Sequence, residues 1–244
     1  MNKISAAILL CTFNGEKYLK EQLLSFEKQS FKNWVLYVSD DGSTDNTKDI
    51  LIRFQKKWGK DKLLLLNGPK KGFATNFMSL SSNQQIMSDY YAFSDQDDVW
   101  KVNKLENAIR CLQKLNNRPA LYCSSSELID SNGVTFGFSR VRPHRINFEN
   151  SLVESVAGGN TMVFNKKAQI LLVKLSQKTV QVISHDWTLY QLITGVGGVI
   201  YYDERPSVFY RQHAKNKIGT NRTYLSKLIR LKYFFNGRYK NYLG

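Results

Sequence analysis

The middle of the chain contains the run Tyr90-Tyr91-Ala92-Phe93-Ser94-Asp95-Gln96-Asp97-Asp98-Val99-Trp100. Its first four residues have the length and aromatic content of a buried β-strand, which ends abruptly in carboxylates. Open α/β sheets bind their ligands at the carboxyl ends of the strands. Three negative charges so close together favour a bound cation, and carboxylate oxygens that leave room for water and phosphate suit Mg²⁺ or Mn²⁺. The alternative is a solvated acidic loop that caps a helix over residues 104–115.

The composition indicates a globular protein with an anionic partner. At 244 residues and 42% apolar content, the chain can fold as one large α/β domain or as a domain with a small appendage. Lys and Arg outnumber Asp and Glu by 35 to 20, a formal charge of +15. This charge favours nucleic acid, an acidic membrane surface or a phosphorylated substrate as the partner, and composition alone does not choose among the three.

Cysteine usage and the apolar segments bear on the compartment. Cys11, Cys111 and Cys123 are odd in number and lack metal-ligand spacing, which predicts reduced thiols in the cytosol. The apolar run at residues 4–11 is short and has no cleavage site, so we expect a first strand rather than a signal peptide. No apolar run reaches the roughly 18 to 20 residues of a membrane span.

The first half of the chain alternates strand, polar turn and helix. Continuous apolar runs predict strands at residues 4–11, 34–39, 62–66 and 90–93. Apolar residues at one-face spacing predict helices between these strands, with Asn14 as the cap of the first helix and Ser43 or Thr44 as the cap of the second. Such alternation, with right-handed crossovers, predicts a mainly parallel, doubly wound α/β sheet through about residue 115.

Polar residues gather where three of these strands end. They are Thr12 and Asn14 after the first strand, Asp40 and Asp41 after the second, and residues 95–98 after the fourth. In a parallel sheet these ends can lie side by side, which is hard to explain as three independent solvated loops. The pattern therefore favours one shared ligand site over the helix-capping alternative.

The pattern changes after residue 115. Strands are predicted at residues 120–124, 161–164, 197–202 and 207–210, with a hairpin at residues 128–138 around Asn132-Gly133. Helices are predicted at residues 166–175 and from His185-Asp186-Trp187 onward. Asp186 falls in the first turn of the second of these helices, where the helix dipole favours a carboxylate.

The chain ends in a basic segment, residues 220–244. From Arg205 to the C-terminus there are ten Lys or Arg and no Asp or Glu. An apolar stripe is predicted from Tyr224, Leu225, Leu228, Leu231, Phe234 and Phe235. A basic amphipathic helix of this kind suits the surface of an anionic membrane, although a helix docked on the domain itself or a solvated tail fits the same pattern.

With its motifs in order, the chain over residues 3–219 resembles family 2 glycosyltransferases of the GT-A fold, and most closely the bacterial rhamnosyltransferase-like members that build surface polysaccharides. The motifs that carry the resemblance are Cys11-Thr12-Phe13-Asn14-Gly15, Ser39-Asp40-Asp41-Gly42-Ser43-Thr44-Asp45, residues 72–76, residues 95–100, His185-Asp186-Trp187 and Tyr210-Arg211-Gln212-His213. Each motif alone is weak, but their order and spacing together are specific. The resemblance implies a GT-A, Rossmann-like sheet with residues 1–115 as the nucleotide-sugar half and residues 116–219 as the mixed half that binds the acceptor and supplies the base.

The resemblance also implies roles for individual residues. For the nucleotide pocket it implies Thr12, Asn14, Glu16, Asp40, Asp41 and Asp95, with Asp40 or Asp41 on the pyrimidine or ribose. For the metal, Mn²⁺ or Mg²⁺, it implies Asp95, Asp97 and His213. Asp186 matches the catalytic base, although His185 stands where the family usually has an acidic residue. Contacts to the acceptor or to phosphate are implied for Gly158, Gly159, Asn160, Trp187 and Arg211.

The reaction that the resemblance implies is an inverting, metal-dependent transfer of a sugar, with rhamnose as the sugar that the resemblance favours. The donor would be a dTDP- or UDP-linked sugar and the acceptor a glycan, lipid-linked at the cytoplasmic face of an anionic membrane. A divalent ion would neutralise the charge that grows on the leaving diphosphate, and a carboxylate would take the proton of the acceptor hydroxyl.

Three other classes of protein compete with this interpretation. A nucleic-acid binding protein is disfavoured because carboxylates at the strand ends would repel a phosphate backbone. A nucleotidyltransferase would carry a basic activating loop near the N-terminus, and the sequence has none there. A catalytically silent relative that only binds a glycan or a partner stays open, although the intact set of Asp95, Asp97 and Asp186 argues against it.

Overall fold

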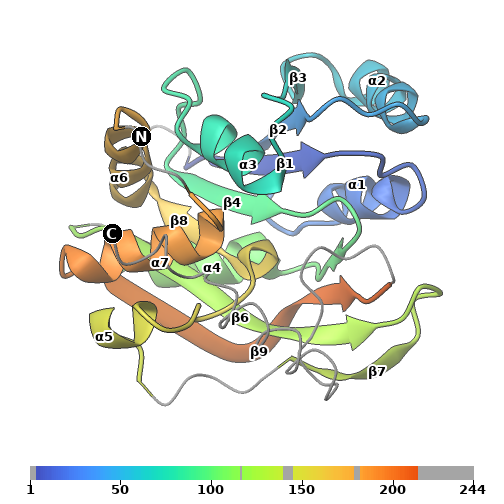
Figure 1. Ribbon diagram of the computed structural model, residues 1–244. Helices are drawn as coiled ribbons and strands as arrows, with labels where there is room; N and C mark the ends of the chain where they lie inside the picture. Colours follow the sequence, from blue (N-terminus) through green and yellow to red (C-terminus); the bar gives the residue numbers. More distant parts are fainter. Residues whose placement is uncertain (1–3, 116, 140–144, 179–181, 214–244) are drawn as a thin grey trace, which may run out of the picture.

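The computed structural model describes residues 4–115, 117–139, 145–178 and 182–213. In the first half of the chain the elements are β1 (Ala6–Thr12), α1 (Leu19–Glu27), β2 (Trp34–Asp40), α2 (Thr47–Trp58), β3 (Leu63–Asn67), α3 (Phe73–Ser81) and β4 (Tyr90–Ser94). Their four strands run parallel in the order β3-β2-β1-β4 (Figure 1). This arrangement confirms the predicted parallel half.

The second half of the chain extends the same sheet. Its elements are β5 (Val99–Trp100), α4 (Lys104–Gln113), β6 (Ala120–Ile129), β7 (Thr135–Phe138), α5 (Phe148–Ser151), the 3₁₀ helix η1 (Gly159–Thr161), β8 (Val163–Asn165), α6 (Lys166–Ser176), α7 (His185–Gly195) and β9 (Val199–Arg211). From β4 the sheet continues through β8, β6, β9 and β5, and β7 pairs with β6. Strand β8 is antiparallel to β4 and β6, whereas β6 and β9 are parallel, so this half is mixed as predicted.

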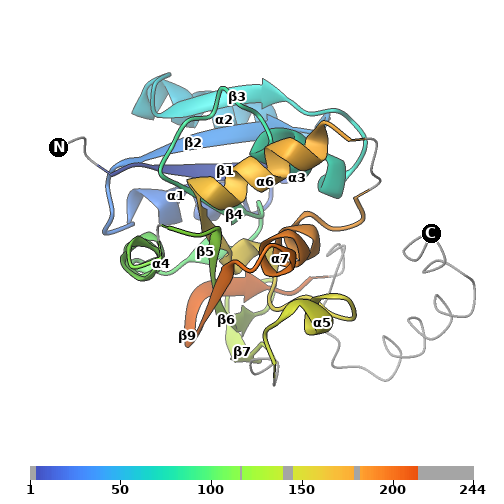
Figure 2. The same cartoon turned by 90° about the vertical axis from the view of Figure 1, so that its left-hand side faces the viewer.

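Helices cover both faces of the sheet because the strands are apolar on both faces. In β1, Ile8 and Leu10 pack into a core with α1, α2 and α4, while Ala7 and Leu9 pack into a second core with α3, α6 and α7. Figure 2 shows α1 and α4 on one side of the sheet and α3, α6 and α7 on the other. Such double coverage is the usual environment of parallel strands that read as unbroken apolar runs.

The register of the parallel strands brings their polar ends together. Thr12 lies opposite Asp40, and Leu10 lies opposite Ser94, so the loops after β1, β2 and β4 leave the sheet at one edge. The predicted side-by-side placement of these three ends is confirmed. It puts the predicted nucleotide residues and the acidic run within one region of the molecule.

The predicted helix caps were wrong. Asn14 has a φ of 50°, and its side-chain oxygen accepts a hydrogen bond from Thr44 N at 2.9 Å, while α1 begins only at Leu19. Helix α2 begins at Thr47, whose N–H donates to Asp45 Oδ1 at 3.0 Å. Short polar side chains bond equally well to nearby loop backbone, and here the loops between strand and helix are longer than the sequence suggests.

Two strand predictions also needed correction. The predicted strands at residues 197–202 and 207–210 are one strand, β9, of 13 residues. Its pairing with β6 shifts register between Ser124 and Ser126, so a bulge absorbs the polar stretch that reads as a break in the sequence. The short strand β5, which pairs with β9, was not predicted because two residues carry no periodicity.

Other predictions concern the thiols, the tail and the membrane. Cys11 and Cys123 are buried, Cys111 is half-buried, and all three are free thiols. The predicted basic helix in residues 220–244 lies outside the described residues. Within the described ranges, every helix is too short or too polar to cross a bilayer.

Candidate active site

Three carboxylates follow β4 at the edge where the strand ends meet. Asp98 is buried, and Asp95 and Asp97 are half-buried. Burial, together with the charge of Asp97, raises the pKa of Asp98 to about 7. Burial, followed by the charges of Asp98, Asp97 and Asp186, raises the pKa of Asp95 well above its usual value. Burial and mutual repulsion thus disfavour the ionised form of these carboxylates, and a cation bound beside them would favour it.

Asp97 and His213 form the part of this loop that could hold a metal ion. His213 Nε2 lies 2.8 Å from Asp97 Oδ2, and both side chains are largely buried. Among the residues that the structure describes, no group of three or more His, Cys, Asp or Glu side chains is arranged to hold a metal. The donor set therefore fits an ion such as Mn²⁺ or Mg²⁺ that takes part of its coordination from substrate phosphate and water. The metal-ligand roles of Asp95, Asp97 and His213 stay predictions.

Asp186 lies in the first turn of α7, as predicted. Gly159 N donates to Asp186 Oδ2 at 3.0 Å, Trp187 N donates to Oδ1 at 2.8 Å, and the Ser184 hydroxyl also donates to Oδ1. The charge of Asp186 contributes to the raised pKa of Asp95, so the two carboxylates lie within electrostatic reach of each other. A carboxylate fixed in this way next to a cation-binding loop can serve as a general base.

His185, the residue before Asp186, is buried against aromatic side chains of the core. Its ring is 5% exposed, stacks on Phe77 with 3.9 Å between ring centroids, and meets the edge of Phe93 at 4.6 Å. Within the described residues neither ring nitrogen has a hydrogen-bond partner. Burial lowers the pKa of His185 to about 4, although the charge of Asp186 opposes the shift. At neutral pH the imidazole is therefore uncharged, and it adds no charge beside Asp186.

The loops after β1 and β2 are joined by polar side chains. The Thr12 hydroxyl donates to Asp40 Oδ2 at 2.9 Å, and Ser43 N donates to Asp40 Oδ1 at 2.9 Å. Burial would raise the pKa of Asp40, but these hydrogen bonds outweigh it and the pKa lies below its usual value. Asp41 accepts two hydrogen bonds, at 2.6 and 2.9 Å, from backbone N–H groups of the loop before α3. Both carboxylates hold the loops around the predicted nucleotide pocket.

Asn14 and Glu16, two further predicted nucleotide residues in the loop after β1, also bond to the loop after β2. Asn14 and Glu16 are exposed, and each bonds to the turn before α2. Glu16 Oε2 accepts a hydrogen bond from Asn46 N at 3.0 Å. The structure thus brings together the five residues predicted from the first two loops, and their contact with a nucleotide stays a prediction.

Sequence reasoning missed the role of Gln96, the middle residue of the acidic run. Its Oε1 accepts a hydrogen bond from Phe13 N at 2.9 Å, and its Nε2 donates to Phe13 O at 3.0 Å. A Cβ added to Gly15 would lie 2.2 Å from Gln96 Oε1, so a side chain at position 15 would displace the Gln96 amide from these hydrogen bonds. The sequence could have indicated this role. Gln96 stands between two aspartates, and its amide has both a donor and an acceptor with which it can bond to the N–H and the C=O of one residue.

Comparison with known proteins identifies the family. The model of glycosyl transferase family 2 matches residues 7–169. The dTDP-rhamnosyl transferase RfbG of Shigella flexneri is 31% identical to this chain over 95% of the chain and 81% of its own length. The chain belongs to glycosyl transferase family 2. It is a glycosyltransferase, and the resemblance stated from its motifs is confirmed.

Other relatives of this glycosyltransferase are matched over part of their length. The UDP-Glc:alpha-D-GlcNAc-diphosphoundecaprenol beta-1,3-glucosyltransferase WfgD of Escherichia coli is 31% identical over 68% of this chain and 62% of its own. The structure of TarS from S. aureus in complex with UDP-GlcNAc matches with a TM-score of 0.63 at 16% identity, over 87% of this chain and 60% of that one. A mannosyltransferase of Pyrobaculum calidifontis in complex with GDP-Man and Mn²⁺ matches with a TM-score of 0.62 at 17% identity, over 98% and 65%. The two structures establish the fold, and this chain spans less than two thirds of each of these three proteins.

Three predicted acceptor or phosphate contacts of the glycosyltransferase bond to the protein itself. The side chain of Arg211 is 2% exposed and its Nε donates to Asp97 O at 2.9 Å, while the backbone N–H of the same residue donates to Asp98 Oδ1 at 3.0 Å. Asn160 is 3% exposed, and its Nδ2 donates to Asp98 Oδ2 at 2.6 Å. Trp187 Nε1 donates to a backbone carbonyl of α5 at 2.6 Å. Arg211 and Asn160 thus hold the acidic loop, and their predicted ligand contacts gain no support from this geometry.

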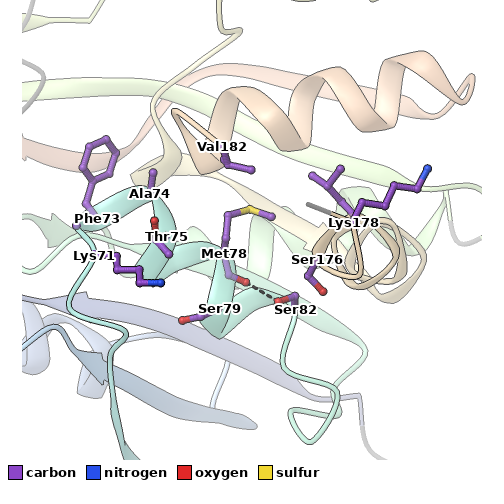
Figure 3. Close-up of a pocket in the computed structure, with 12 residues that line it drawn as sticks. Lys71, Phe73, Ala74, Thr75, Met78, Ser79, Ser82, Ser176, Lys178 and Val182 are labelled. Carbon is purple, nitrogen blue, oxygen red and sulfur yellow. Dashed lines mark hydrogen bonds between the residues drawn. The ribbon is translucent and has the colours of Figure 1, made fainter. Parts of the chain in front are cut away.

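A cavity of about 480 Å³ opens between α3 and the end of α6 (Figure 3). Several hydroxyl groups and the side chains of Lys71 and Lys178 line it, but Lys178 extends away from the other side chains, so the two ammonium groups do not converge (Figure 3). At one end lies Phe73, whose ring centroid is 6.3 Å from that of His185. None of the predicted site residues of the glycosyltransferase lines this cavity. It adjoins the helix that carries Asp186 without being part of the acidic site.

Proposed function

We propose that this glycosyltransferase moves a sugar from a nucleoside-diphosphate donor to a hydroxyl group of a growing bacterial surface glycan, with inversion at the sugar carbon. One observation carries the proposal: a carboxylate held by three hydrogen bonds, Asp186, lies within electrostatic reach of the acidic loop at the end of β4. Direct displacement needs a proton acceptor on one reactant and charge stabilisation on the other, and these two features can supply them.

The donor would bind at the carboxyl edge of the parallel strands. The rim that Thr12, Asn14, Glu16, Asp40 and Asp41 form would take the nucleoside, which fits their placement around one loop junction. A divalent ion bound there stabilises the negative charge of the leaving diphosphate. The names of RfbG, a dTDP-rhamnosyl transferase, and of WfgD, which uses UDP-Glc, support a dTDP- or UDP-linked donor, with rhamnose as the first sugar to test.

Within the donor site, some residues of the acidic loop would bind the metal ion and others would contact the nucleotide. Asp97 and His213, with nitrogen and oxygen atoms 2.8 Å apart, would hold the Mn²⁺ or Mg²⁺ ion. Asp95 would face the ribose or the same ion. Burial and the charges of three neighbouring aspartates raise the pKa of its carboxyl group. Its raised pKa falls back toward the usual range once a cation is bound nearby, because an opposite charge favours the ionised form.

The acceptor hydroxyl would be deprotonated by Asp186. Hydrogen bonds from Gly159, Trp187 and the Ser184 hydroxyl fix the plane of this carboxylate, and Oδ2, which accepts only one of them, keeps a lone pair for a substrate proton. The neighbouring His185 is uncharged at neutral pH because its pKa is about 4. Asp186 would therefore act next to an uncharged ring, which neither adds to nor offsets the negative charge around it.

We further propose that the acceptor is lipid-linked and that the basic C-terminal segment holds the enzyme at the inner face of an anionic membrane. The support is the formal charge of +15 and the ten Lys or Arg that follow residue 204 without a compensating acid. Each such residue near an anionic surface contributes about 1 kcal/mol, and the contribution decreases with salt. The name of WfgD, which includes a diphosphoundecaprenol acceptor, points to the same class of acceptor.

The test is a thermal-shift panel of dTDP- and UDP-sugars with and without Mn²⁺, followed by a product assay with the donor that binds. A ligand that binds the folded state raises its melting temperature by mass action. We expect one donor to stabilise the protein more strongly with Mn²⁺ than without it. If no nucleotide sugar binds, the proposal fails. If a donor binds and no acceptor, including water, ever receives the sugar, the catalytically silent alternative replaces it.

A further inference from the structure

The direction of one strand brings the two sides of the active site together. Strand β8 is antiparallel to β4, so the turn that enters β8 lies beside the loop that leaves β4. That turn is η1, and the residue after it bonds to β4, where Phe93 N donates to Met162 O at 3.2 Å. A segment distant in sequence is thereby fixed against the start of the acidic loop.

Consecutive residues of this turn bond to opposite sides of the site. Asn160 Nδ2 donates to Asp98 Oδ2 at 2.6 Å, on the side of the acidic loop. Gly159 N donates to Asp186 Oδ2 at 3.0 Å, on the side of the base. The turn is tightened by hydrogen bonds of its own, since Thr161 N and its hydroxyl both donate to Gly158 O, at 3.0 and 2.9 Å. A shift of the turn would therefore move both bonds at once.

Lys104 supports this turn from the core. Its side chain is 1% exposed, its ammonium group donates to Asn160 O, and it lies 3.8 Å from the centre of the Trp100 ring. Burying an ammonium group is costly unless charges and hydrogen bonds compensate it. Here the compensation comes from Asn160, from the aromatic face and from the nearby charges of Asp98 and Asp95, which oppose the lowering of the Lys104 pKa by burial. Asn160 is thus held at its backbone and at its side chain.

The turn also fits closely against the helix that carries the base. A Cβ added to Gly159 would lie 2.7 Å from His185 Nε2 and 3.1 Å from Asp186 Cβ. Contacts this short leave no space for a side chain at position 159, so the backbone of the turn packs directly against His185 and Asp186. The spacing between turn and base is set by packing as well as by the hydrogen bond.

We propose that Asn160 and Lys104 are positioning residues that hold the acidic loop and Asp186 at a fixed separation. Neither contacts a substrate in this role; both act through Asp98 and through the turn that bonds to Asp186. The inference rests on the proposed function, in which the acidic loop binds the donor with its ion and Asp186 deprotonates the acceptor. It changes the expected role of Asn160 from acceptor contact to a support that serves both halves of the reaction.

The test compares Asn160→Ala and Lys104→Met with the control Asn165→Ala. Asn165 is also 3% exposed and also donates a hydrogen bond from Nδ2, but its acceptor is the backbone carbonyl of Arg118, at 2.8 Å, and it caps α6 at the far end of β8. Calorimetry would measure the affinity for dTDP and UDP with and without Mn²⁺, and kinetics would measure kcat. Loss of an outer-shell partner typically costs about 10- to 100-fold in metal affinity or activity. We expect that loss in both variants for Mn²⁺-dependent binding and for kcat, with metal-free binding nearly unchanged, whereas Asn165→Ala lowers only the melting temperature.

Asn160→Asp separates the hydrogen bond from the volume of the side chain. The aspartate has almost the same size but replaces the donor with a second carboxylate against Asp98, so we expect a loss at least as large as that of Asn160→Ala. Parent-like Mn²⁺-dependent binding in Asn160→Asp would overturn the inference, and so would equal kinetic effects of Asn160→Ala and Asn165→Ala. If the parent binds dTDP or UDP with Mn²⁺ but transfers no sugar, the proposed function fails, while the binding comparison still decides whether Asn160 positions the acidic loop.

Discussion

Replacement of Asp186 by asparagine tests the proposed base most directly. The side chain keeps its size, so the start of α7 should still form, but an amide cannot take a proton from an acceptor hydroxyl. Removal of a general base typically lowers turnover by about 10² to 10⁴. This corresponds to roughly 3 to 5 kcal/mol of transition-state stabilisation. We expect donor and Mn²⁺ affinity to stay close to those of the parent, because the donor-side residues are unchanged.

The structure also sets the expected cost in stability. The new amide oxygen can keep the hydrogen bonds from Trp187 N and the Ser184 hydroxyl, whereas the new NH₂ group would face Gly159 N–H. A buried donor left without an acceptor costs about 1 to 3 kcal/mol. For a chain of 244 residues we therefore expect the melting temperature to fall by a few degrees, since each kcal/mol corresponds to about 2–4 °C.

The assay is single-turnover sugar transfer at saturating donor, with donor affinity and melting temperature measured on the same preparation. Ser184→Ala is the matched control, because it removes a hydrogen bond to the same carboxylate and leaves the carboxylate in place. We expect this control to lose some stability and at most about tenfold in turnover. If Asp186→Asn melts earlier but transfers sugar at the parent rate, Asp186 only stabilises the helix N-terminus, and the base is another residue.

Three further predictions concern the ion, the buried histidine and the tail. Asp97→Asn should abolish the Mn²⁺-dependent part of donor binding while the melting temperature of the free protein stays within a few degrees; equal nucleotide affinity with and without Mn²⁺ in the parent would contradict this. His185 has a folded-state pKa of about 4, below its usual value of 6.5, so its contribution to stability is lost as the pH falls from about 6.5 toward 4, by on the order of 3 kcal/mol. Denaturant unfolding between pH 4 and 7 should therefore show a weaker pH dependence for His185→Phe than for the parent, and identical slopes would disprove the assignment. Truncation after Gly219 should release the protein from anionic vesicles at low salt, which a sedimentation assay measures against neutral vesicles; equal sedimentation of both forms would reject the membrane role.

The parallel half of the fold and the residues at its strand ends could be predicted because their signals are local. An apolar run that stops at Asp40 or Asp95 shows in the sequence both the strand and the edge at which it ends. The merging of the two late segments into β9 could not be predicted in this way, because a bulge against β6 is a property of the pair of strands. The helix caps failed for a similar reason, since Asn14 bonds across to Thr44 rather than to its own helix.

Burial of basic side chains was the other feature that sequence reasoning missed. Lys104 and Arg211 are basic residues in a basic chain, and nothing in their local sequence separates them from exposed lysines and arginines. In the structure their side chains are 1% and 2% exposed. Lys104 is compensated by the charges of Asp98 and Asp95 and by its hydrogen bond to Asn160 O, whereas the Arg211 guanidinium pairs with Glu21 and donates to Asp97 O. Of these groups, only the acidic residues 95–98 could be recognised from the sequence.

The reversal of strand direction between β4 and β8 explains why the acidic loop at residues 95–98 and Asp186 lie at the same edge of the sheet. A parallel strand beside β4 would begin at the opposite edge of the sheet, and the turn that precedes it would lie far from the acidic loop. Because β8 is antiparallel, its first residue, Val163, lies opposite Ala92 toward the carboxyl end of β4, while its last residue, Asn165, lies opposite Tyr90 at the start of β4. The turn before β8 therefore reaches Asp98, and its backbone N–H reaches Asp186. One change of direction at the junction of the two halves brings the acidic loop and Asp186 to the same edge, which is where an open α/β sheet can hold a substrate between them.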